Sequence, residues 1–93
     1  MQDLMYGPIM DEFGNYDRTM REGDIVRHFK GNLYQIVGRV RNTENKEYFM
    51  CYRALYGNQL LYIRPWNMFF SKVDKTKYTD ASQVYRFEKI EFY

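Results

Sequence analysis

The feature that most constrains the fold is the stretch 24–41, DIVRHFKGNLYQIVGRVR, where side chains alternate on both sides of a short turn. Gly31 and Asn32 tolerate positive φ, which a two-residue hairpin turn requires, so we expect a tight turn at residues 30–32. A period of two, carried by β-branched and aromatic residues, predicts two paired strands with one buried face. The side chains expected to share a face are Val26, His28 and Lys30 on the first strand, and Tyr34, Ile36, Gly38 and Val40 on the second.

The rest of the chain continues this pattern of short strands and turns. Pro65 is expected to end one strand, because it cannot donate to a ladder, and to begin a single helical turn. The pattern predicts an all-β domain, a small antiparallel SH3-like barrel of five to six strands, with a five-stranded OB-type barrel as the alternative. After the hairpin, the expected elements are a polar loop at 42–45, strands at 46–54 and 60–64, a helical turn at 65–69, and strands at 70–73 and 85–92.

Composition divides the chain into an N-terminal extension, residues 1–22, and a small β-barrel domain, residues 23–93. The first 20 residues carry four acidic side chains and one basic one, together with many apolar residues. We therefore expect the extension to pack on or near the barrel, or on a second subunit. The remainder of the chain is mildly basic within a net charge of +2, which permits a polyanionic partner.

Several classes of protein are disfavoured. No apolar run is long enough to span a membrane, so no membrane partner is expected. Cys51 is the single cysteine, which rules out an intrachain disulfide and predicts a reducing, cytoplasmic setting. One histidine and one cysteine cannot supply the usual three or four ligands of a zinc site, and no glycine-rich phosphate loop is present. We expect no metal, no cofactor and no catalytic residues, and therefore no enzyme.

Three short patterns resemble a known bacterial family. They are H-x-K-G-N-x-Y from His28, Y-R-A-L-Y-G from Tyr52 and R-P-x-x-M-F from Arg64, followed by Arg86-Phe87. Together they resemble the domain-of-unknown-function family numbered 1653, over roughly residues 22–90. The family tends to carry Trp where Tyr62 stands. The resemblance implies a compact β domain and no particular activity.

Basic and aromatic side chains interleave along the first four expected strands. Basic groups attract phosphates, and exposed rings offer faces on which unpaired bases stack. We therefore expect a module that binds single-stranded nucleic acid, RNA in particular. The alternative is a protein-interaction module that binds a peptide, or a second copy of itself, through an aromatic groove. The candidate ligand-binding residues are His28, Lys30, Tyr34, Arg39, Tyr52, Arg53, Tyr56, Arg64 and Trp66.

A purely structural interpretation competes with these hypotheses. Tyrosines that alternate along strands also build a core and its rim, with arginine stems lying over them. Arg53 and Arg64 stand among large apolar neighbours, where an unpaired charge is costly. In the structural interpretation, these two side chains are held by Glu44, by Glu47 or by turn carbonyls. In the functional interpretation, their guanidinium groups are free for a phosphate or carboxylate.

Overall fold

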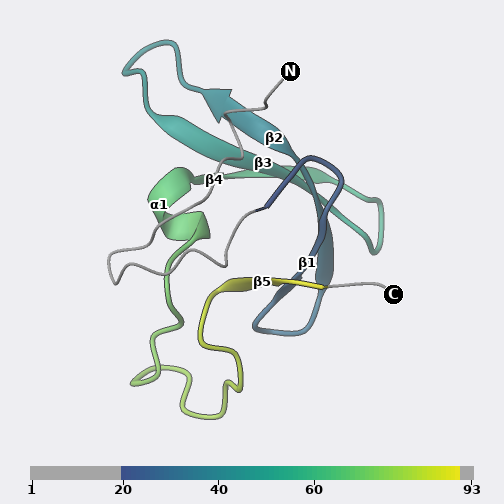
Figure 1. Cartoon of the computed structure of the whole chain (residues 1–93), viewed down its shortest axis with the longest axis vertical. Helices are drawn as coiled ribbons and strands as arrows, with labels where there is room; N and C mark the ends of the chain where they lie inside the picture. The colour runs from purple at the N-terminus through teal and green to yellow at the C-terminus, as the bar shows by residue number, and fades with distance from the viewer. Residues whose placement is uncertain (1–19, 91–93) are drawn as a thin grey trace.

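Five strands and one short helix make up the structure, a computed structural model that describes residues 20–90 (Figure 1). All five strands belong to one antiparallel sheet with the order β4-β3-β2-β1-β5. The all-β prediction is confirmed, whereas residues 1–19 of the expected extension lie outside the described residues. The elements are β1 (Ile25–His28), β2 (Leu33–Arg41), β3 (Tyr48–Ala54), β4 (Leu61–Pro65), α1 (Trp66–Phe69) and β5 (Phe87–Lys89).

The sheet curls without closing into a full barrel. Strands β4 and β5 are the two ends of the strand order, and within residues 20–90 no ladder joins them. Figure 1 shows β5 crossing below the rest of the sheet, reached by the long connection that follows α1. The two edges approach each other through side chains, because the guanidinium carbon of Arg64 on β4 lies 5.8 Å from the ring centre of Phe87 on β5.

The core lies on the inner face of this curved sheet, which we define as the face that carries Val26, Ile36 and Met50. The rings of Phe69 on α1 and Phe87 on β5 are both fully buried. They stack with their centres 4.2 Å apart and their planes 12° apart, so they fill the open side of the sheet. The buried apolar residues are Met20, Val26, Ile36, Met50, Tyr52, Ala54, Phe69, Phe70, Val73 and Phe87.

A β-bulge in β2 changes the expected face of its second half. The register shifts between Ile36 and Gly38, which leaves Val37 as the extra residue. Beyond the bulge Arg39 takes the inner-face position, and Val40 turns outward with 39% of its surface exposed. The prediction that Val40 shares a face with Ile36 is wrong, because one inserted residue reverses the alternation.

The first turn and the last two strands also differ from the expectation. β1 ends at His28 and β2 begins at Leu33, so the first connection has four residues instead of a tight two-residue turn. Gly31 has a φ of 109°, as predicted, whereas Asn32 is not among the described residues with positive φ. The predicted strand 70–73 is reduced to one isolated bridge, and the predicted strand 85–92 is reduced to β5.

Candidate functional site

Four tyrosines gather on the inner face and form what we call the tyrosine cluster: Tyr34, Tyr52, Tyr56 and Tyr62. Tyr52 and Tyr62 are directly paired across β3 and β4, with their ring centres 5.9 Å apart. The ring of Tyr34 on β2 lies 5.3 Å from that of Tyr52. Tyr52 is buried, whereas Tyr56 and Tyr62 are 43% and 39% exposed. The cluster therefore has a buried base and an exposed rim.

The hydroxyl group of Tyr34 remains protonated at physiological pH. The hydroxyl oxygens of Tyr34 and Tyr56 lie 3.0 Å apart, within hydrogen-bond distance. Burial and this hydrogen bond raise the pKa of Tyr34 to about 12. The neutral Tyr34 hydroxyl can therefore both donate and accept hydrogen bonds.

Two arginines from distant parts of the chain lie beside this cluster. Arg64 on β4 donates from Nε to the Tyr52 hydroxyl at 3.2 Å. Arg86, just before β5, donates from Nε to the Ser71 hydroxyl at 3.2 Å. Burial and the charge of Arg64 lower the pKa of Arg86. Among residues 20–90 the ion pair is Lys89 with Asp24, so neither Arg64 nor Arg86 has a described carboxylate partner. The two guanidinium groups make this part of the inner face positive.

His28, at the end of β1, responds to the same positive charge. Its ring centre lies 5.0 Å from that of Phe87. Burial and then the charges of Arg64, Arg86 and Lys30 lower the pKa of His28 to about 4. Its Nδ1 accepts a hydrogen bond from the backbone N–H of Lys30 at 3.1 Å. His28 is therefore neutral at physiological pH, and its remaining proton is on Nε2.

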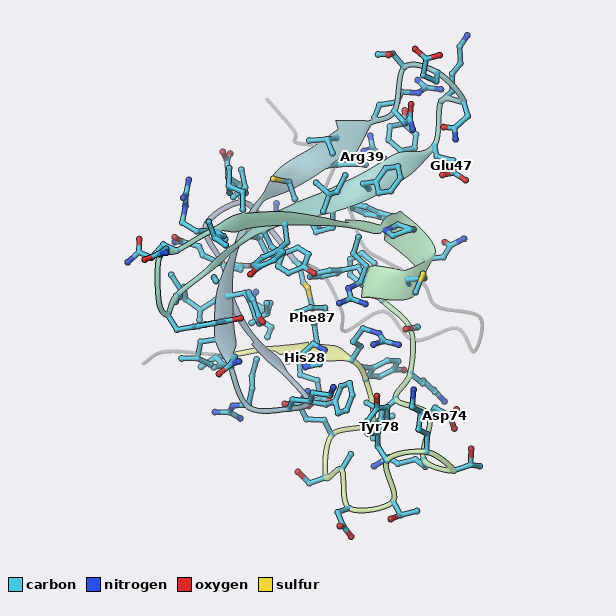
Figure 2. The ribbon with its side chains drawn as sticks, turned by 180° about the vertical axis from the view of Figure 1, so that it is seen from behind. His28, Arg39, Glu47, Asp74, Tyr78 and Phe87 are labelled. Carbon is cyan, nitrogen blue, oxygen red and sulfur yellow. The ribbon has the colours of Figure 1, made fainter. Side chains whose placement is uncertain are left out.

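Arg39 and Trp66 form a separate group at the other end of the sheet. The guanidinium carbon of Arg39 lies 4.1 Å from the ring centre of Tyr48 and 5.7 Å from that of Trp66. Arg41 lies over the same Tyr48 ring at 4.7 Å. Figure 2 shows Arg39 near the far end of β2 and β3, well away from His28. These cation–π contacts hold the side chains in place and do not bring them to the tyrosine cluster.

Arg53 has a structural role in the β3–β4 hairpin. Its side chain donates from Nη1 to the carbonyl of Gln59 at 3.0 Å. It stands opposite Leu61 in the ladder, on the outer face of the sheet. Of the two interpretations for this arginine, the contact with a turn carbonyl is the one observed, and the side chain lies away from the tyrosine cluster.

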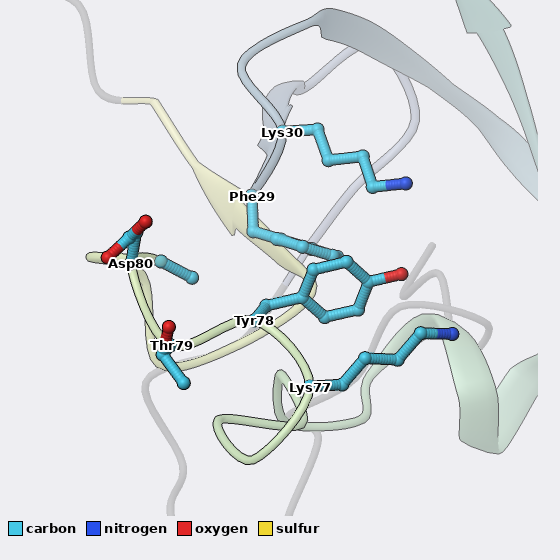
Figure 3. A pocket seen from close by; sticks show the side chains of 7 residues that line it. Phe29, Lys30, Lys77, Tyr78, Thr79 and Asp80 are labelled. Carbon is cyan, nitrogen blue, oxygen red and sulfur yellow. The ribbon is translucent and has the colours of Figure 1, made fainter.

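Lys30 lines a pocket of about 360 Å³ below the first turn (Figure 3). The Phe29 and Tyr78 rings meet edge to face there, with their centres 4.8 Å apart. The ammonium nitrogens of Lys30 and Lys77 each lie 5.3 Å from the centre of the Tyr78 ring, on either side of it. Lys30 thus contributes positive charge near His28, but its side chain belongs to this neighbouring pocket.

The candidate residues divide into those that meet at the tyrosine cluster and those that do not. His28, Tyr34, Tyr52, Tyr56 and Arg64 come together there, whereas Lys30, Arg39, Arg53 and Trp66 lie elsewhere. The site also contains Tyr62, Arg86 and Phe87, which were not among the candidates. Tyr62 was detectable, because it alternates with Arg64 along one strand. Arg86 was not, because its position depends on how the last strand folds back across the sheet.

Other kinds of site find little support within residues 20–90. No group of three histidine, cysteine or acidic side chains in this range is placed to hold a metal ion. None of the helices in the same range is long and apolar enough to cross a membrane. Cys51 is half-buried in β3, paired across the ladder with Ile63 on the outer face. The inner face therefore remains the place where charged, polar and aromatic groups converge.

Comparison with known proteins gives a family but no characterised relative. No curated protein and no solved structure matches the chain. The family described as "Protein of unknown function (DUF1653)" matches residues 24–89, a range that includes all the described strands together with His28, Arg64 and Arg86. The match covers more than half of the sequence. The chain therefore belongs to the DUF1653 family.

Proposed function

We propose that this protein is a non-catalytic, cytoplasmic binding module whose inner face binds single-stranded nucleic acid, RNA in the first place. The observation that carries the proposal is the pair formed by Arg64 and Arg86. Both guanidinium groups are partly buried beside aromatic rings, and no described carboxylate neutralises either of them. A partly buried charge without a counter-ion is costly, and an anionic ligand would offset that cost.

The hydrogen bonds of the two arginines suit a phosphate ligand. Each Nε is held by a neighbouring hydroxyl group, that of Tyr52 for Arg64 and that of Ser71 for Arg86. The terminal nitrogens of both side chains have no acceptor within residues 20–90. A guanidinium that is fixed at Nε and open at its terminal nitrogens can donate two hydrogen bonds to one phosphate.

The tyrosine cluster supports a nucleic acid rather than a free anion. The exposed rings of Tyr56 and Tyr62 lie next to the positive charge and provide flat faces on which unpaired bases can stack. The cluster also presents hydroxyl groups, which can exchange hydrogen bonds with a ribose 2′-hydroxyl. Rings and cations together are the usual components of a surface that binds single strands.

Fluorescence anisotropy with a labelled, mixed-sequence single-stranded RNA tests this proposal at low and at moderate salt. We expect saturable binding that weakens steeply as salt rises, because bound phosphates release counter-ions. Arg64→Gln and Arg86→Gln should each weaken binding about tenfold, an estimate for one lost charged contact. The matched control is Arg27→Gln, which removes the same charge from an exposed position on β1 and should bind as the wild type does.

Three results would count against the proposal. No binding at tens of micromolar protein would refute it. So would equal binding by the wild type and both inner-face variants, since the RNA would then lie elsewhere. Binding of a peptide that is insensitive to salt, with no binding of RNA, would favour the alternative of a protein-interaction groove on the same rings.

A further inference from the structure

Strand β4 is an edge strand whose first three residues lack the usual protection against pairing, although Arg64 and Pro65 follow them. β3 lies on one side of it, and within residues 20–90 no strand lies on the other. Its first three side chains, Leu61, Tyr62 and Ile63, are uncharged, and Leu61 and Ile63 are 52% and 58% exposed. Natural sheets usually protect such an edge with charged side chains, bulges or very short strands. An apolar, exposed edge is therefore suited to pairing with another strand.

The opposite edge of the sheet is protected in the usual way. β5 has only three residues, and the side chain of its first, Phe87, is fully buried. The other two, Glu88 and Lys89, are charged, and Lys89 forms an ion pair with Asp24 at 3.4 Å. The contrast makes β4 the edge at which a second chain would add to the sheet.

The hydrogen bonds between β3 and β4 show which residues of β4 direct their backbone N–H and C=O groups away from β3. The N–H of Ala54 donates to the carbonyl of Leu60 at 2.9 Å, which shows that Leu60 turns its backbone groups toward β3. Backbone direction alternates along an antiparallel strand, so Tyr62 also faces β3 while Leu61 and Ile63 face outward. The outward N–H and C=O groups of Leu61 and Ile63 have no partner strand within residues 20–90.

From this geometry we propose that two copies of this chain pair through β4, edge to edge and antiparallel, about a two-fold axis that passes beside Tyr62. Leu61 of one copy then stands opposite Ile63 of the other, and their outward backbone groups complete about four hydrogen bonds. The strand is complementary to itself in this register.

Other registers fit the same edge less well. The next outward position after Ile63 is Pro65, which has no N–H to donate, so a shift toward it loses hydrogen bonds. A shift the other way brings in Gln59, whose φ of 55° is not that of a strand. The Tyr62-centred register is therefore the one in which both copies offer donors and acceptors.

The pairing joins two sheets into one continuous sheet. On the outer face, the exposed Leu61 and Ile63 side chains of both copies cover one another. On the inner face, the Tyr62 rings meet and place the two tyrosine clusters side by side. A single strand pair buries less than the roughly 1,600 Å² of a standard interface, so we expect a dissociation constant in the micromolar range. This association does not depend on the proposed nucleic-acid binding.

Sedimentation velocity of the full chain, from about one to several hundred micromolar, tests the association. We expect a concentration-dependent dimer in the wild type. Ile63→Pro removes an outward N–H without removing a hydrogen bond to β3, and should weaken the dimer at least tenfold while circular dichroism shows the fold retained. The matched control Val84→Lys changes another exposed apolar residue outside β4 and should leave the dimer unchanged. A wild type that stays monomeric, or a dimer that Ile63→Pro does not weaken, would overturn the proposal.

Cysteine cross-linking tests the register, in a Cys51→Ser background that removes the native thiol. Cα atoms of a pair without mutual hydrogen bonds lie about 4.5 Å apart, within reach of a disulfide. Under mild oxidation Tyr62→Cys should therefore form a disulfide-linked dimer. Ile63→Cys, which stands opposite Leu61 of the other copy, should cross-link several-fold less. Equal cross-linking by both variants, or none by Tyr62→Cys, would contradict the two-fold axis at Tyr62.

Discussion

At the scale of single residues, His28 is both a part of the site and a reporter of its charge. It is the only histidine in the sequence. Burial and the charges of Arg64, Arg86 and Lys30 hold its pKa at about 4, below its ordinary value of 6.5. The neutral form is therefore the one that the folded protein favours, whereas the unfolded chain takes up the proton more readily.

This difference predicts that acid weakens the fold through His28. The contribution is fully present above pH 6.5 and is lost as the pH falls toward about 4, because only the unfolded state then binds the proton. Since the ring is partly exposed, solvent screening reduces the loss to about 1 kcal/mol. His28→Gln should flatten the pH dependence of the unfolding free energy over this window, as measured by urea denaturation at several pH values. Identical slopes for variant and wild type would contradict the assignment.

At the scale of elements, the alternation of residues predicted β1 to β4 and most of the inner face. It could not place Arg39 and Val40, because the extra residue Val37 is an ordinary strand residue and reverses the pattern after it. The glycine beside it, Gly38, was an available indication of a bulge. The last strand was predicted too long, since residues 85–92 alternate in sequence but only β5 finds a partner in β1.

The contact between α1 and β5 should contribute strongly to stability. Phe87 is fully buried and stacks on Phe69. We expect Phe87→Ala to destabilise the fold by about 3–5 kcal/mol, the cost of losing a buried ring and leaving a cavity. Val84→Ala, at an exposed position three residues earlier, should change stability by less than about 0.5 kcal/mol. Urea unfolding measures both, and equal effects would show that the ring stack does not support the sheet.

At the scale of the whole molecule, the site exists because the sheet curls without closing. Arg64 and Arg86 lie on segments far apart in the sequence, and the fold-back of β5 brings both to the inner face. Residue types along the strands predicted a basic and aromatic surface. Which of them converge was not predictable, because it depends on the curvature of the sheet and on the path of residues 70–86.

The salt dependence of RNA binding should report both arginines together. If each contacts one phosphate, the double variant Arg64→Gln/Arg86→Gln should lower the slope of log affinity against log salt by about 1.4, at roughly 0.7 per contact for a single strand. Anisotropy titrations at four or more salt concentrations measure this slope. An unchanged slope with weakened affinity would mean that the arginines support the fold of the site without touching phosphate.

The most direct test of the proposed site is the pKa of His28, followed by NMR through its single imidazole Hε1 signal, with and without single-stranded RNA. Burial and then the charges of Arg64, Arg86 and Lys30 lower this pKa. A phosphate bound between Arg64 and Arg86 offsets the contribution of charge but not that of burial, so we expect RNA to raise the pKa part of the way from about 4 toward 6.5. The control Arg27→Gln should show the same rise. RNA that binds while the pKa of His28 stays at about 4 would place the ligand away from the inner face and contradict the proposal.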